Sequence, residues 1–168
     1  MKFNITIFFL IFNISLFSQT DFTIASQEDV SKFQIGSKVF DLMSKFEITF
    51  GDIDTQEIVD QLKKLTSITS YSSNTLLGLS NIESSFNEYI LGSELTQLIE
   101  FEEDGYIVNI YTLENEDSVI EEISMLVKKS NNLNTIYLQI KGEIDLMKIV
   151  KVVNKLDVPG GVYLKKLN

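Results

Sequence analysis

The chain has 168 residues, a formal net charge of −10 and 44% hydrophobic residues, and it contains no cysteine, histidine, arginine or tryptophan. These absences exclude disulfides, thiolate metal sites, a lipid anchor on cysteine, thiol or imidazole catalysis, and bidentate guanidinium clamps on phosphate. The negative charge argues against a nucleic-acid partner, because such binding depends on neutralising phosphates.

The N-terminal segment has the pattern of a secretory signal peptide. Lys2 precedes an apolar run over residues 3–17, which ends at Ser18 before a polar stretch. The run is shorter than the roughly 20 residues that a permanent transmembrane helix needs. We therefore expect cleavage after residue 18, export of the mature chain to the periplasm or envelope, and no integral membrane segment after cleavage. A retained membrane anchor and a buried N-terminal strand or helix are the alternatives.

The mature chain, residues 19–168, has the size of one ordinary domain, and no repeat or Pro/Gly-rich linker divides it. Apolar positions at helical spacing predict helices in its first half, with an apolar stripe of Val39, Leu42, Met43 and Phe46 on the first of them. β-branched and aromatic content predicts one strand. The expected elements are a short extended piece at 30–35, helices at 38–46 and 55–65, a strand at 67–72, and helices at 81–91 and 94–101.

The second half predicts strands at 106–113 and 135–141 and a final helix at 146–156. Residues 118–128 are ambiguous. Ser118 and Glu121 form a capping box that slightly favours a helix, whereas the alternating apolar residues fit a strand equally well. The local pattern leaves both alternatives open.

Charge is unevenly distributed along the chain. Residues 65–127 contain twelve acidic residues and no lysine, whereas residues 128–168 contain eight lysines and three acidic residues. On the final helix Lys148, Lys151 and Lys155 share one face, and we predict this face as the candidate partner-binding surface. A solvated acidic face beside a basic helix is the plainer interpretation, and a polarised surface that docks a charged partner or divalent cations is the alternative.

Two short motifs at the end of the chain predict how the fold is specified. Gly142 allows a sharp turn at a strand end, and Asp145 can cap the helix that follows. Pro159, Gly160 and Gly161 stop that helix and start a turn. We interpret both motifs as fold-specifying rather than as a ligand site or a docking loop.

The segment 138–149, followed by Pro159-Gly160-Gly161, resembles the end of the domain-of-unknown-function family 4252, a family of small exported Bacteroidetes proteins. The Ser18-Gln19 junction and the helix at 37–44 are also similar to that family. The resemblance implies an uncharacterised envelope protein with no assigned catalytic residues, and an association with envelope stress through neighbouring sigma-factor genes. It also implies that residues 118–128 form a strand in an antiparallel meander, which we adopt because strand pairing overrides local propensity.

We therefore expect an α+β fold with an antiparallel sheet of about four strands and helices packed on one face, in the order α-α-β-α-β-β-β-α. The expected function is non-enzymatic, without cofactor or metal: an exported envelope protein that binds another protein. A carrier or sensor of an apolar ligand is the alternative. A hydrolase that uses paired carboxylates is the weaker one, because nothing in the sequence places two acids at a defined separation.

Overall fold

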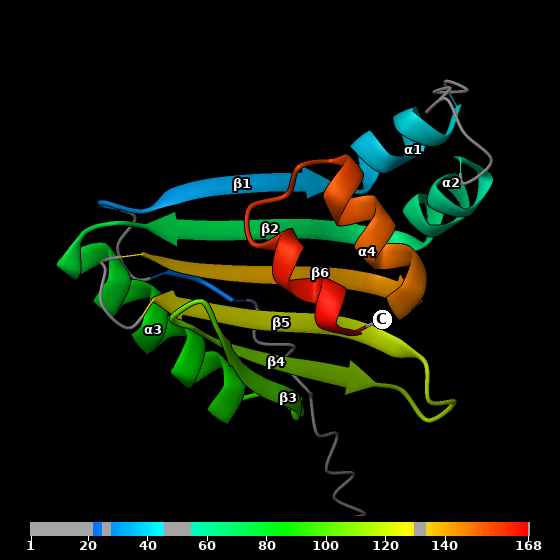
Figure 1. Ribbon diagram of the computed structural model, residues 1–168. Helices are drawn as coiled ribbons and strands as arrows, with labels where there is room; N and C mark the ends of the chain where they lie inside the picture. The colour runs from blue at the N-terminus through cyan, green and yellow to red at the C-terminus, as the bar shows by residue number, and fades with distance from the viewer. Residues whose placement is uncertain (1–21, 25–27, 46–54, 130–133, 168) are drawn as a thin grey trace, which may run out of the picture.

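The computed structural model of the chain describes residues 22–24, 28–45, 55–129 and 134–167. It contains one antiparallel sheet of six strands in the order β1-β2-β6-β5-β4-β3 (Figure 1). Along the chain the elements are β1 (Ser31–Gly36), α1 (Ser37–Lys45), α2 (Thr55–Lys64), β2 (Leu65–Ser73), α3 (Leu76–Leu91), β3 (Thr96–Glu103), β4 (Tyr106–Glu114), β5 (Ile120–Lys129), β6 (Thr135–Ile144), α4 (Leu146–Lys155) and the 3-10 helix η1 (Gly161–Leu167).

Strands β3 to β6 form a meander in which each strand pairs with the next one in the chain. Strand β2 then pairs with the free side of β6, so that Ile140 of β6 lies between Ile68 of β2 and Ile123 of β5. Strand β1 completes the sheet beside β2. The sheet therefore has β6 near its middle and β1 and β3 as its two edges.

The sheet has a hydrophobic core on each face. On β6, Leu138 and Ile140 point to one core, whereas Tyr137 between them points to the other. The larger core packs α1, α2, α4 and η1 onto the sheet, and Figure 1 shows α4 and η1 crossing the central strands. The larger core consists of Phe40, Ile58, Leu62, Leu65, Ile68, Val108, Ile110, Ile123, Met125, Val127, Leu138, Ile140, Ile144, Ile149, Val150, Val152, Val153, Val158 and Leu164.

The second core lies under α3, which Figure 1 shows away from the other helices. We call it the aromatic core because five of its members carry aromatic rings. Its residues are Phe22, Ile24, Tyr71, Ile82, Phe86, Tyr89, Leu95, Leu126 and Tyr137. The expectation that the helices pack on one face is thus wrong, since α3 covers the face opposite to the other helices.

The expected number of strands is also wrong, because the sheet has six strands rather than about four. Residues 94–101 were predicted as a helix, but most of them belong to β3, which pairs with β4. The short extended piece at 30–35 becomes β1 through pairing with β2. Both strands depend on hydrogen bonds to a neighbouring strand, which local spacing does not reveal. The strand expected at 118–128 is confirmed as β5.

Helix α1 also departs from its predicted apolar stripe. Val39 and Leu42 are exposed, whereas Phe40, between them in the sequence, is fully buried. Phe46 and the segment 1–18 lie outside the described residues. No helix in the described part of the chain is long and apolar enough to span a membrane.

Candidate functional site

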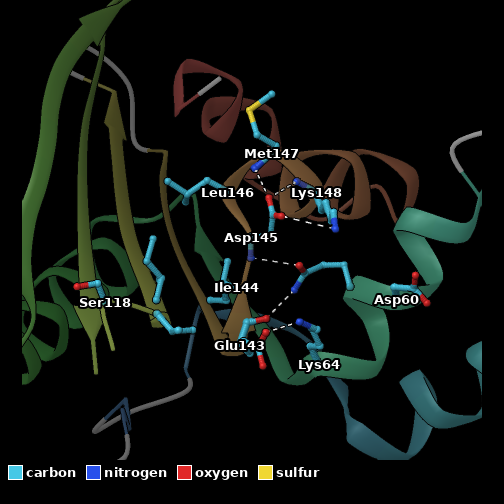
Figure 2. A pocket seen from close by; sticks show the side chains of 12 residues that line it. Asp60, Lys64, Ser118, Glu143, Ile144, Asp145, Leu146, Met147 and Lys148 are labelled. Carbon is cyan, nitrogen blue, oxygen red and sulfur yellow. Dashed lines mark hydrogen bonds and ion pairs between the residues drawn. The ribbon is translucent and has the colours of Figure 1, made fainter. Parts of the chain in front are cut away.

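A cleft of about 430 Å³ opens where β6 ends and α4 begins (Figure 2). Three parts of the chain line it: the second half of α2, the turn before β5, and the junction between β6 and α4. Its lining residues are Asp60, Gln61, Lys64, Ser118, Val119, Ile120, Glu143, Ile144, Asp145, Leu146, Met147 and Lys148.

Gln61 lines the cleft, is 1% exposed, and makes hydrogen bonds to the β6–α4 junction through its side-chain amide. Its Nε2 donates to the backbone oxygen of Glu143 at 2.8 Å, and its Oε1 accepts from the backbone nitrogen of Asp145 at 3.1 Å. One side chain of α2 therefore satisfies backbone groups on both sides of Ile144, where the strand gives way to the helix. This fixes α2 against the β6–α4 junction.

The charged side chains around the cleft neutralise one another. Lys64 Nζ donates to Glu143 Oε1, and this hydrogen bond and the attraction of the carboxylate raise the pKa of Lys64 (Figure 2). Lys148 Nζ lies 3.7 Å from Asp145 Oδ2. Because these pairs are exposed, they contribute little to stability. They do leave the rim polar but locally balanced.

The junction itself depends on Gly142 and Asp145. Gly142 has a φ of +133°, and a Cβ at this position would lie 2.3 Å from the backbone oxygen of Lys64. The carboxylate of Asp145 accepts hydrogen bonds from the backbone nitrogens of Met147 at 3.0 Å and Lys148 at 3.2 Å, which caps α4. The backbone of Gly142 thus turns the chain, and the side chain of Asp145 starts the helix.

The second motif brings the chain back over the sheet after α4. The backbone oxygen of Pro159 accepts from Ser70 Oγ at 3.1 Å, and Gly160 has a φ of +87°. A Cβ on Gly161 would lie 2.9 Å from Cβ of Val153, so η1 packs closely against α4. The turn is therefore tightly packed.

A buried polar cluster, which was not among the predicted sites, lies between α3 and the sheet. Glu122 is 5% exposed, and its carboxylate accepts from Tyr89 Oη at 2.9 Å and Ser124 Oγ at 2.7 Å. Gln139 Nε2 donates to the same carboxylate at 2.9 Å, and Lys141 Nζ lies 3.7 Å from it. The spacing of Glu122 with Ser124, and of Gln139 with Lys141, places two polar pairs on one face of adjacent strands, which is the signal that could have indicated the cluster.

Aromatic rings pack around this polar cluster. Phe22 lies 4.1 Å from the ring of Tyr137 and 5.7 Å from that of Tyr89, measured between ring centroids. Burial raises the pKa of Tyr137 well above its ordinary value, and its hydroxyl lies 3.0 Å from Ser124 Oγ. The carboxylate of Glu122 is thus held by several donors in an enclosed site, as expected for a structural charge.

The family model DUF4252, a domain of unknown function, matches residues 22–152. The chain belongs to the DUF4252 family. The matched segment begins at Phe22 of the aromatic core and includes the cleft and the polar cluster. Comparisons with curated proteins and with solved structures found no significant match.

The three lysines predicted to bind a partner have different surroundings in this DUF4252 domain. Lys148 lines the cleft, whereas Lys151 Nζ lies 2.9 Å from Glu57 Oε2 and links α4 to α2. Lys155 is exposed at the end of α4. Lys148 is the one of the three that borders the cleft, and a binding role for the others stays a prediction. No group of three or more His, Cys, Asp or Glu side chains suited to a metal ion occurs within the described ranges.

Proposed function

We propose that this DUF4252 protein is an exported, non-enzymatic envelope protein that binds another protein, and that the cleft beside α4 forms part of its docking surface. The association with envelope stress that the family resemblance implies fits a protein that acts by contact. The partner would insert an apolar side chain into the cleft and meet the charged rim around it.

The observation that carries the proposal is the exposed side chain of Met147, which lines the cleft. Met147 is 59% exposed, and the partly buried residues Leu146, Val119 and Ile120 lie along the same cleft. Methionine is flexible and polarizable, and it adapts well to a partner surface. An apolar centre with a polar rim is the usual anatomy of a protein interface.

The acids of the cleft have structural partners, which supports a binding role over a hydrolytic one. Glu143 is held by Lys64, and Asp145 is committed to the cap of α4. A general acid or nucleophile needs a carboxylate that is available to substrate. The chain also lacks histidine and cysteine, the side chains that most often serve as base or nucleophile at neutral pH.

The alternative, a carrier of an apolar ligand, has less support. The space between α3 and the sheet is occupied by the rings of Phe22, Phe86 and Tyr137. The ring centroid of Tyr137 lies 4.1 Å from that of Phe22 and 5.5 Å from that of Phe86. Native mass spectrometry of the purified protein separates the two functions. A co-purifying lipid would favour the carrier, and a mass equal to that of the polypeptide alone would favour the protein-binding function.

The direct test is crosslinking in intact cells followed by mass spectrometry, with the double variant Met147→Asp, Lys148→Glu. Acidic residues in the first turn of α4 suit the helix dipole, so this variant is expected to stay folded. We expect capture of the specific partner to fall at least about tenfold, because a central apolar anchor of an interface contributes about 2 kcal/mol or more and about 1.4 kcal/mol corresponds to a tenfold change.

The matched control is Val162→Asp, Lys165→Glu on η1, which changes an exposed apolar residue and an exposed lysine outside the cleft. Its capture should equal that of the wild type. Equal loss in both variants, or unchanged capture in the cleft variant, would contradict the proposal. So would recovery of the uncleaved precursor from the cytosol, or turnover of a substrate by the purified protein.

A further inference from the structure

Strand β3 is one edge of the sheet, and its outer side is unpaired within the described residues. It pairs with β4 from Thr96 to Glu103, with a bulge between Gln97 and Ile99. An edge strand presents a row of unpaired backbone N–H and C=O groups, with which another extended chain can form hydrogen bonds. The β3 edge, residues 96–103, is therefore a potential strand-addition site.

Strand β3 is anchored to the larger core through one of its faces. Ile99 and Phe101 pack against the larger core, and Glu103 Oε1 lies 2.8 Å from Lys166 Nζ of η1. Glu100 and Glu102 alternate with these residues and are exposed. A strand that is anchored in this way loses little conformational entropy when a partner chain pairs with it.

Apart from Glu103, which pairs with Lys166, the acidic residues on and beside β3 are not neutralised within the described part of the chain. Glu94, Glu102 and Asp104 have no lysine within ion-pair distance there, and the partner of Glu100 is the neutral amide of Gln97 at 3.4 Å. Negative potential therefore accumulates along the same edge that offers the unpaired backbone.

The opposite edge of the sheet differs. Strand β1 contains no acidic residue, and its Lys32 Nζ lies 5.4 Å from the ring centroid of Tyr71. Its chain continues directly into α1 at Ser37. The acidic edge is therefore specific to β3.

We propose that the β3 edge docks an extended, basic segment of another protein, which adds to the sheet as a seventh strand. Side chains on one face of a strand recur every second residue, so lysines or arginines at alternate positions would meet Glu100 and Glu102. The side chain of Leu98, which is 43% exposed, offers an apolar contact beside them. A second copy of the chain is a poor occupant, because pairing β3 with β3 would bring glutamates near glutamates.

The proposal is tested with a capped eight-residue peptide in which lysine alternates with threonine or valine, added to isotope-labelled protein. We expect amide shifts and slowed hydrogen exchange along residues 96–103. The variant Glu100→Lys, Glu102→Lys should weaken peptide binding about tenfold, since two attractive pairs become repulsive. The same variant should gain affinity for a peptide in which glutamate replaces lysine.

Two controls separate strand addition from simple charge attraction. The variant Glu116→Lys, Asp117→Lys alters two exposed acids in the turn before β5, and it should bind within about twofold of wild type at physiological salt, where screening is strong beyond about 8 Å. Two peptides, N-methylated at the odd-numbered or at the even-numbered residues, should differ at least tenfold in affinity. Only one of these two sets of backbone N–H groups would point toward β3 and form hydrogen bonds with it.

Shifts located outside residues 96–103, equal weakening in the two acid-reversal variants, or indifference to both methylation patterns would overturn the proposal. Concentration-dependent self-association through β3, measured by sedimentation, would also overturn it in favour of a second copy. The β3 edge is separate from the cleft, so failure here leaves the cleft proposal intact, and loss of capture in the cleft variant leaves this one intact.

Discussion

The two faces of the sheet are stabilised in different ways although the same strands build both. On β6, Leu138 and Ile140 enter the larger core, whereas Tyr137 and Gln139 point toward α3. The larger core is almost entirely aliphatic, and four helices cover it. The aromatic core has one long helix, several rings and a buried carboxylate at its margin.

The two cores therefore stabilise the fold through different interactions, hydrophobic burial in the larger core and directional hydrogen bonds beside the aromatic core. Hydrophobic burial is non-directional, so the larger core accepts several helices wherever their apolar faces fit. Hydrogen bonds require defined geometry, and the bonds from Tyr89 to Glu122 select one position of α3 on the sheet. We therefore expect the larger core to provide most of the stability and the polar cluster to define the placement of α3.

The largest effect is expected in the larger core, from Leu138→Ala. Leu138 is fully buried, and the substitution should lower the free energy of unfolding by about 4 kcal/mol through lost burial and the cavity that remains. Chemical denaturation measures the change. The control Leu77→Ala makes the same substitution at a position 51% exposed on α3 and should change stability by less than about 0.5 kcal/mol. Similar losses for the two variants would contradict this assignment of the core.

The polar cluster is tested by Glu122→Ala, which should cost about 3 kcal/mol because it removes the buried carboxylate that accepts from Tyr89, Ser124 and Gln139. Glu122→Gln keeps one acceptor oxygen and should cost roughly 1–2 kcal/mol. Hydrogen exchange should rise first in α3 in both variants. Exchange that rises equally in α4 would show that the cluster does not specifically hold α3.

A smaller effect is expected from Tyr137→Phe, about 1 kcal/mol at neutral pH for the lost hydrogen bond with Ser124. The pH dependence is more informative. Burial raises the pKa of Tyr137 in the folded protein, so above about pH 10 the unfolded chain loses this proton while the folded chain keeps it. The contribution of Tyr137 to the free energy of unfolding is therefore fully present below about pH 10, and it is lost as the pH rises further.

Denaturation at pH 9 and pH 11 should show a weaker alkaline loss in Tyr137→Phe than in the wild type. The matched variant on the other face is Tyr163→Phe, where burial, with smaller contributions from Tyr106, raises the pKa of a more exposed hydroxyl. The variant Tyr163→Phe should reduce the alkaline loss of stability less than Tyr137→Phe does. An equal or larger effect of Tyr163→Phe would contradict the assignment of the enclosed hydroxyl to the aromatic core.

The smallest effect is expected at the exposed ion pair between Lys151 and Glu57, which links α4 to α2. Lys151→Ala should cost less than about 1 kcal/mol. A double-mutant cycle with Glu57→Gln measures the coupling between the two side chains. A coupling above about 2 kcal/mol would show that this pair, rather than aliphatic packing, secures the helices on the larger core.

Local patterns were sufficient where an element carries its own signals. The alternation at 135–141 predicted the first part of β6, and Asp145 before a helical apolar pattern predicted the start of α4. The strand predicted at 106–113 is confirmed as β4, which spans Tyr106–Glu114. Each of these segments has a strong period or a cap within a few residues, so its local pattern was sufficient to predict it.

The tertiary structure decided the features that depend on pairing across the chain. Most of residues 94–101 have helical spacing but form β3, because hydrogen bonds to the neighbouring strand β4 outweigh local propensity. The placement of α3 opposite the other helices depends on Glu122, which lies 33 residues from Tyr89 in the sequence. The cleft likewise needs Gln61 to meet a junction 82 residues away at Glu143. The sequence by itself thus determined composition, charge and the elements with strong local periods, whereas the second face, the edges and the cleft arose from contacts whose partners are remote along the chain.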